Sequence, residues 1–263
     1  MTLFQILVLA LVQGVSEYLP VSSSAHLVLV HWFTDWPDQG LAFDAAVHVG
    51  TLAAVCLYFR AELARLARAA FDPSDRAGRV LLVGLALATL PAVLVGAFLA
   101  DWIELWLRSP QVIAATTIGF GLLLGLADRY GRRIHELDRL GIGSALLIGL
   151  AQALALVPGT SRSGITITAG LLLGLTRQAA ARYSFLLAIP IIAAAGGWGF
   201  VRGLAAGGEF EAGQFALGAL ASGLFAWATI ALFLAWLQRA GMLPFVIYRL
   251  VLGVFLLAWF APV

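Results

Sequence analysis

The chain has 263 residues, of which 62% are hydrophobic and 11% are charged. A soluble domain carries about 25% charged residues, so this composition excludes an ordinary soluble protein and indicates an all-α polytopic membrane protein. The net charge is only +2, and the basic residues form no contiguous face, so no nucleic-acid partner is expected.

The first 33 residues hold a polar tract, from Gln13 to His26, between two short apolar arms. An arm of about 15 residues reaches about 22 Å as a helix, short of the roughly 30 Å hydrocarbon core. We therefore expect a re-entrant helical hairpin over residues 1–33, broken at Pro20. Non-helical backbone at that depth is tolerated only where it is buried in protein or lines a wet cavity, so the tract predicts a cavity.

Six uncharged or nearly uncharged runs have the roughly 20 residues that a membrane-spanning helix needs. They are 41–59, 80–100, 110–127, 183–201, 212–237 and 240–261. All sixteen basic residues are Arg, and twelve of them lie in alternate connections: Arg60, Arg65, Arg68, Arg76, Arg79, Arg129, Arg132, Arg133, Arg139, Arg177, Arg182 and Arg239. Because Arg-rich loops stay on the cytoplasmic side, these connections are expected to face the cytoplasm.

A second polar tract, from Pro158 to Gly164, also lies between short apolar arms. Residues 141–176 are therefore expected to form a second re-entrant hairpin. Ionisable groups at this depth cost several kcal/mol each, roughly 2.5 to 3.5 on insertion scales. A chain that carries them there is expected to use them.

The two halves of the chain form an internal repeat. A shift of 138 residues aligns Pro20 with Pro158 and Ser22 with Thr160. Three spans follow the hairpin in each half, and because three is odd, the second half enters the membrane from the opposite side. The expected architecture is a single membrane domain, 1–263, with six transmembrane helices and two re-entrant hairpins in an inverted-topology repeat. Its parts are a first repeat over about 1–130, with hairpin 1–33 and spans within 41–127, and a second over about 140–263, with hairpin 141–176 and spans within 183–261.

The polar side chains of the two tracts suit an anion site. A helix that begins at the serines after Pro20 offers free N–H groups and a positive dipole end, which suit a phosphate. Arg162 can add a bidentate hold on phosphate oxygens. Gln13 and Glu17 share one helix face, and their oxygens can hold Mg²⁺ or Ca²⁺ against substrate phosphates. Glu17 and His26 also supply an acid/base pair.

At these residues the chain resembles the undecaprenyl-pyrophosphate phosphatase family, the integral-membrane type associated with bacitracin resistance. The matching tracts read Gln13-Gly14-Val15-Ser16-Glu17-Tyr18-Leu19-Pro20-Val21-Ser22-Ser23-Ser24-Ala25-His26 and Pro158-Gly159-Thr160-Ser161-Arg162-Ser163-Gly164. The likeness covers the whole chain, including the stretches 43–51 and 244–249. It implies hydrolysis of a C55 polyprenyl diphosphate to the monophosphate, which recycles the lipid carrier of cell-wall synthesis. It also implies a multi-pass protein of the bacterial inner membrane whose site opens toward the outer, periplasmic side.

The resemblance also implies roles for individual residues. The matching catalytic positions are Glu17, Ser23, His26 and Arg162, and the residues expected to bind the substrate phosphate are Ser22, Ser24, Thr160, Ser161, Ser163 and Gly164. Two schemes stay open: either Ser23 attacks the terminal phosphorus while His26 or Glu17 moves protons, or Glu17 activates a water. Many members have an acidic residue where this chain has Gln13, which can bind metal but cannot act as a base. Ala25 replaces the usual glycine.

The place of Asp44 and His48 and the oligomeric state are both left open by the sequence. Asp44 and His48, one turn apart in the first span, either line the cavity or lie at its interfacial end. The partners expected are a polyprenyl diphosphate and membrane lipids, with monomer and homodimer both open.

Other classes of function are weighed against the phosphatase. Inverted repeats with broken helices are transporter architecture, so the alternative is a transporter or flippase for polyprenyl phosphate or a small anion. A protein that only transports an anion would not need the Glu17 carboxylate, which repels the anion. A phosphatase can use it as a base or a metal ligand, so the phosphatase is favoured. A structural scaffold is disfavoured by the cost of burying so many polar groups.

Overall fold

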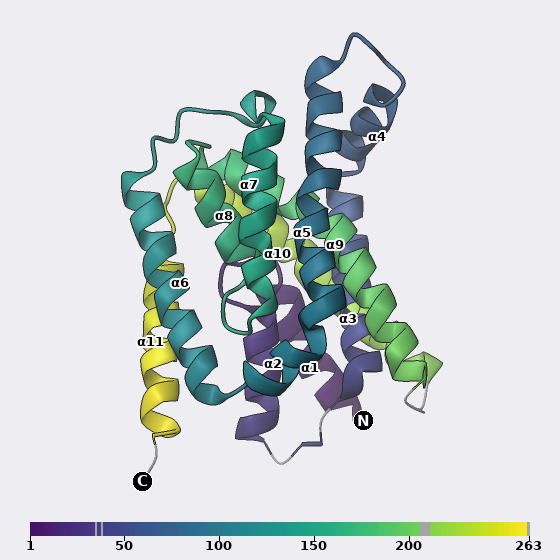
Figure 1. Cartoon of the computed structure of the whole chain (residues 1–263). Coiled ribbons are helices and arrows are strands. Elements are labelled where there is room, and N and C mark those ends of the chain that lie inside the picture. The colour runs from purple at the N-terminus through teal and green to yellow at the C-terminus, as the bar shows by residue number, and fades with distance from the viewer. Residues whose placement is uncertain (35, 38, 206–210, 262–263) are drawn as a thin grey trace.

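The computed structural model describes residues 1–34, 36–37, 39–205 and 211–261, and these residues form a bundle of helices (Figure 1). The all-α class is thus confirmed for the part of the chain that is described. The helices are α1 (Leu3–Ser16), α2 (Ser23–Phe33), α3 (Gly40–Tyr58), α4 (Arg60–Ala69), α5 (Arg76–Trp106), α6 (Pro110–Tyr130), α7 (Ile142–Ala153), α8 (Arg162–Leu172), α9 (Arg177–Ala205), α10 (Ala212–Leu237) and α11 (Leu243–Trp259), with short 3-10 turns η1 (Leu137–Arg139) and η2 (Leu154–Leu156).

Among the described residues, four helices, α5, α6, α9 and α10, are long and apolar enough to cross a bilayer. A fifth span results if α3 and α4, which are bent by 74° at their junction, are counted as one broken span. The last predicted span corresponds to α11, whose 17 residues reach only about 25 Å. Helix α5 begins before the predicted run because the Asp75 carboxylate caps it, accepting a hydrogen bond from the Gly78 N–H at 2.8 Å.

Both polar tracts break a helix, as the sequence predicts. The first break separates α1 from α2, and the second separates η2, which continues α7, from α8. In Figure 1 the α1–α2 pair lies in the lower half of the bundle and the α7–α8 pair in the upper half. The two pairs therefore approach one another from opposite ends.

The two breaks match structurally with a shift of 139 residues rather than the predicted 138. Ser22 and Ser161 each precede an 11-residue helix and each have positive φ, 76° and 71°. Each hydroxyl contacts the serine two residues on, Ser24 at 3.3 Å and Ser163 at 3.2 Å. The alignment on the two prolines is one residue off because the second loop has one more residue between its proline and its helix. The first residues of α2 and α8 are therefore structural equivalents.

Close helix packing fixes the first tract within the bundle. A Cβ at Gly14 would lie 2.6 Å from the carbonyl oxygen of Ser222 in α10, so a side chain there would push the helices apart. Just after α1, Tyr18 is buried with its ring centroid 5.1 Å from that of Phe185 in α9. Its hydroxyl donates to the Thr51 carbonyl at 2.8 Å. Tyr18 thereby anchors the backbone next to Glu17 to two helices, α9 through its ring and α3 through its hydroxyl.

Candidate active site

Glu17 lies at the centre of the site. It follows α1 directly, and its N–H donates to the Gln13 carbonyl at 3.0 Å. Its side chain is only 6% exposed, and its carboxylate accepts three hydrogen bonds. Gln13 Nε2 donates to Oε2 at 3.0 Å, Ser23 Oγ donates to Oε2 at 2.6 Å, and Arg162 Nη2 donates to Oε1 at 3.0 Å. One carboxylate therefore joins the two tracts.

Arg162, the first residue of α8, is held in place by three groups. Besides the ion pair with Glu17, its Nη1 donates to the Ser184 carbonyl of α9 at 2.9 Å. Its guanidinium carbon lies 5.7 Å from the centroid of the Tyr18 ring, within range of a cation–π contact. The guanidinium is thus oriented before any ligand arrives.

A cavity of about 200 Å³ opens beside this ion pair. Its lining residues come from both tracts and from α3, η2 and α9: Glu17, Ser22, Ser23, Ser24, His48, Ala155, Ser161, Arg162, Ile191, Ile192 and Ala195. The cavity therefore has a polar wall made by the two helix starts and an apolar wall made mainly by α9. A phosphate attached to a hydrocarbon chain matches this division.

His48 lines the cavity, whereas Asp44 is not among its lining residues. The Asp44 carbonyl, which can only accept, lies 2.6 Å from His48 Nδ1. We therefore assign a proton to Nδ1. Nε2 lies 3.8 Å from Glu17 Oε2. The Asp44 carboxylate accepts from Gln39 Nε2 at 2.9 Å. Of this predicted pair, only the histidine reaches the site.

His26 lies one turn along α2 from Ser23, and its ring is directed toward α11. Its Nδ1 is 2.7 Å from the Ser22 carbonyl, and its Nε2 is 2.5 Å from the hydroxyl of Tyr248 in α11. The two rings stack, with centroids 5.6 Å apart. His26 is not among the residues that line the cavity, so the described geometry gives Glu17, and not His26, the direct contact with the Ser23 hydroxyl.

The predicted phosphate-binding residues divide into two groups. Ser22, Ser24 and Ser161 line the cavity. Ser163 donates instead to the Leu19 carbonyl at 2.7 Å and so ties the two tracts together. Gly164 donates its N–H to Ser161 Oγ at 3.1 Å, and Thr160 is buried behind the break with its hydroxyl unbonded within the described chain. Three of the six thus face the cavity.

The predicted divalent cation would find oxygen ligands here, and the ring nitrogen Nε2 of His48 lies close to them. The described residues contain no group of three His, Cys, Asp or Glu side chains that would hold a metal ion alone. Gln13 Oε1 is buried and has no hydrogen-bond partner in the described chain, while its Nε2 is fixed on Glu17. Glu17 lines the cavity and Gln13 does not. A carboxylate, and the amide oxygen of the residue bonded to it, fit a hard cation whose remaining ligands are phosphate oxygens and water.

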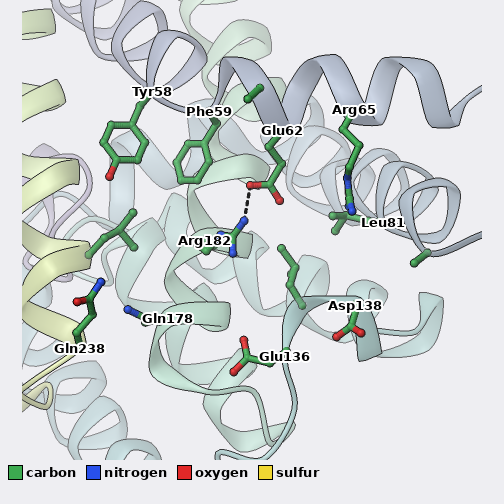
Figure 2. Close-up of a pocket in the computed structure, with 14 residues that line it drawn as sticks. Tyr58, Phe59, Glu62, Arg65, Leu81, Glu136, Asp138, Gln178, Arg182 and Gln238 are labelled. Carbon is green, nitrogen blue, oxygen red and sulfur yellow. Dashed lines mark hydrogen bonds and ion pairs between the residues drawn. The ribbon is translucent and has the colours of Figure 1, made fainter. Parts of the chain in front are cut away.

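A second cavity, of about 800 Å³, lies at the junction of α3 and α4 (Figure 2). The Glu62 carboxylate and Arg182 Nη2 pair at 2.8 Å in its wall. Tyr58 lines this cavity and His48 lines the first. Ten helical residues of α3 separate them, a distance of about 15 Å. None of the predicted site residues is among those that line the second cavity.

Sequence reasoning assigned no role in the site to Tyr248, and it left Arg249 open between a contact with lipid phosphate and a structural partnership with a carbonyl or with Asp44. Both residues lie in the stretch 244–249, which contributes to the family resemblance, and this is the sequence feature that could have pointed to them. Tyr248 holds His26, and Arg249 is fully buried against both breaks.

Comparison with known proteins agrees with this geometry. The family described as bacitracin resistance protein BacA matches residues 6–255. A relative from Chromohalobacter salexigens, named undecaprenyl-diphosphatase, is 54% identical over 97% of this chain and 98% of its own length. Relatives with the same name from Thioalkalivibrio sulfidiphilus and Alcanivorax borkumensis are 56% and 53% identical, and they cover 99% and 98% of this chain and 100% and 99% of their own lengths. The chain therefore belongs to the BacA bacitracin-resistance protein family.

Proposed function

We propose that this chain is an undecaprenyl-diphosphatase, which hydrolyses undecaprenyl diphosphate to undecaprenyl monophosphate and phosphate and so recycles the lipid carrier of cell-wall synthesis. The relatives that cover its full length carry this name. The observation that carries the proposal is the Glu17 carboxylate, bonded to a serine hydroxyl of one tract and a guanidinium of the other. A nucleophile, a base and an anion holder in mutual contact are what phosphoryl transfer needs.

In the proposed reaction, the terminal phosphate enters between the starts of α2 and α8. Arg162 turns its N–H groups from Glu17 to the phosphate oxygens, which frees the carboxylate to act as a base. Ser23 Oγ attacks phosphorus and passes its proton to Glu17, while the bond from phosphorus to the bridging oxygen breaks and prenyl monophosphate leaves. Water then hydrolyses the phosphoserine. In the second scheme Glu17 takes the proton of a water that attacks phosphorus directly.

Glu17 and the Gln13 amide oxygen would hold a divalent cation, Mg²⁺ or Ca²⁺, when substrate is bound. Such a cation supplies charge neutralisation at the phosphate oxygens. Gln13 itself orients Glu17 through Nε2 and moves no proton. His26, bonded to the Ser22 carbonyl, steadies the start of α2 beneath the nucleophile.

We further propose the membrane arrangement. Spans α3, α5, α6, α9, α10 and α11 cross the inner membrane, and the α1–α2 and α7–α8 pairs enter as re-entrant hairpins of an inverted repeat. A 17-residue α11 is accommodated by local thinning of the bilayer. His48 lies in the first half of α3, away from the Arg-rich α4 that follows this helix. With α4 cytoplasmic, the site opens toward the periplasm.

Phosphate release from C55 prenyl diphosphate by the purified protein in detergent tests the function. Release is expected with Mg²⁺ or Ca²⁺ and is expected to fall at least about tenfold when EDTA removes the cation. Full activity in EDTA would contradict the proposed cation. No release in any condition, from protein shown to be folded, would contradict the phosphatase and favour transport of the same lipid.

The second cavity is expected to have no part in the chemistry. Glu62→Gln removes one partner of an ion pair whose Arg182 side chain is 46% exposed, and such pairs contribute about 0–1 kcal/mol. Its kcat/KM for phosphate release should stay within about twofold of the wild type. A loss of tenfold or more in folded protein would assign this cavity a role in turnover.

A further inference from the structure

Arg249 is a buried cation without an acidic partner. Its side chain, in the middle of α11, has no exposed surface, and no carboxylate among the described residues pairs with it. Its hydrogen bonds within the described part of the chain all go to backbone carbonyls. Nε donates to Thr117 at 3.0 Å, Nη1 to Pro20 at 3.3 Å, and Nη2 to Gly159 at 2.9 Å and Thr116 at 3.4 Å.

These carbonyls connect three parts of the fold. Pro20 belongs to the first break and Gly159 to the second, while Thr116 and Thr117 belong to α6. Thr116 adds a bond of its own from Oγ1 to the Pro158 carbonyl at 2.6 Å. One guanidinium therefore holds both breaks against the same helix.

The carbonyls at the breaks need such a donor. A chain that leaves the helix at membrane depth has carbonyls without helical N–H partners, and neighbouring groups must satisfy them. The planar guanidinium offers five N–H groups in fixed directions, whereas an ammonium group offers three on a flexible stem. Arginine, and not lysine, suits a position that must bond to four carbonyls on three segments.

The bonded carbonyls lie close in sequence to the reacting groups. Pro20 precedes Ser23 by three residues, and Gly159 precedes Arg162 by three. A Cβ at Gly164 would lie 2.8 Å from Arg249 Nη1, so the guanidinium abuts the first turn of α8. Movement of Arg249 would therefore shift Ser23 and Arg162, two of the three residues whose side chains donate to the Glu17 carboxylate.

We propose that Arg249 is a positioning residue for the phosphatase site. By bonding to both breaks, it sets the starts of α2 and α8 at the separation at which Ser23 and Arg162 meet the Glu17 carboxylate. This inference rests on the proposed function and adds a residue that touches neither substrate nor the reacting atoms.

A gentle displacement of Arg249 tests the proposal without removing it. In Gly121→Ala, the new methyl group of α6 would lie 3.0 Å from Arg249 Cβ and 3.3 Å from its Nε. The whole Arg249 side chain, from Cβ to the guanidinium, must give way by a few tenths of an ångström. Because misplacement by 1 Å costs up to about 10²-fold in rate, kcat is expected to fall about five- to tenfold, with KM within about twofold.

Gly125→Ala is the matched control. It lies one turn along α6, and its methyl group would meet Cγ1 of Val246 in α11 at 3.3 Å, a milder crowding of the same helix pair in which no atom of Arg249 is among the three nearest. Both substitutions also replace glycine in a helix by the better helix former. The control is expected to keep kcat within about twofold of the wild type. Equal kcat values for the two variants, whether both are retained or both are reduced, would overturn the proposal.

Amide hydrogen exchange gives a readout that does not depend on activity. Arg249→Lys keeps the charge but cannot bond to all four carbonyls, so faster exchange is expected at both breaks, residues 17–22 and 157–161, in protein that retains its helix content. Unchanged exchange at either break would overturn the proposal. A wild-type protein without phosphatase activity would contradict the proposed function alone, and exchange would then decide the role of Arg249.

Discussion

Arg162→Ala is expected to lower kcat/KM for phosphate release by about 10³-fold or more, because an arginine that stabilises a transferring phosphoryl group contributes about 10³ to 10⁵ in rate. The loss has two causes. The guanidinium no longer binds the phosphate oxygens, and Glu17 is left as a buried carboxylate whose ion pair at 3.0 Å is gone. The measurement is phosphate release from C55 prenyl diphosphate by protein matched for helix content.

Arg182→Ala is the control for this substitution. It also removes an arginine from an ion pair, 2.8 Å from Glu62, but at the second cavity. The control should retain wild-type kcat/KM to within about twofold. Comparable losses in both variants would mean that loss of any such ion pair damages the fold and that Arg162 has no special place in the reaction.

Glu17→Gln is expected to lower the rate of turnover nearly as strongly as Arg162→Ala. The amide is nearly isosteric with the carboxylate and can still accept a hydrogen bond from Ser23, but it cannot take a proton. General-base catalysis contributes about 10² to 10⁴ in rate, so kcat should fall by about 10³-fold. The expected loss is the same whether Ser23 or a water is the nucleophile, because Glu17 is the base in both schemes.

Glu136→Gln makes the same chemical change at an exposed carboxylate of the second cavity and should leave kcat unchanged. If Glu17→Gln protein of normal thermal stability turned over substrate at the wild-type rate, Glu17 would not be the base. His48, whose Nε2 lies 3.8 Å from Glu17 Oε2, would then be the next group to test.

Helix positions followed from the sequence in part, because the apolar runs are long and the polar tracts at Pro20 and Pro158 interrupt helices, whereas Pro91 and Pro190 lie inside α5 and α9. The two breaks lie where Pro20 and Pro158 predict them. Helix ends were less predictable, since polar ends continue a helix when a cap such as Asp75 is present. The register of the repeat was one residue off because the length of an irregular loop cannot be inferred from a matching proline.

The composition of the site was predictable only in part. The meeting of Glu17, Ser23 and Arg162 followed from two polar tracts at corresponding places, and the structure brings the three side chains into contact. The partner of His26 did not follow, because Tyr248 is 222 residues away in the chain. Arg249 was ambiguous for the same reason: its carbonyl acceptors come from segments that only the fold brings together. The catalytic roles of these residues stay predictions.

The most direct test of the central claim, that the two tracts form one catalytic site, is a double-mutant cycle on kcat/KM with Glu17→Asp and Arg162→Lys. Each keeps its charge but changes its geometry, and each is expected to cost about 10- to 100-fold. Residues that act as a unit give non-additive losses, so the double variant should lie within about threefold of the weaker single variant. Losses that simply multiply would show that the two residues act independently and would contradict a shared site.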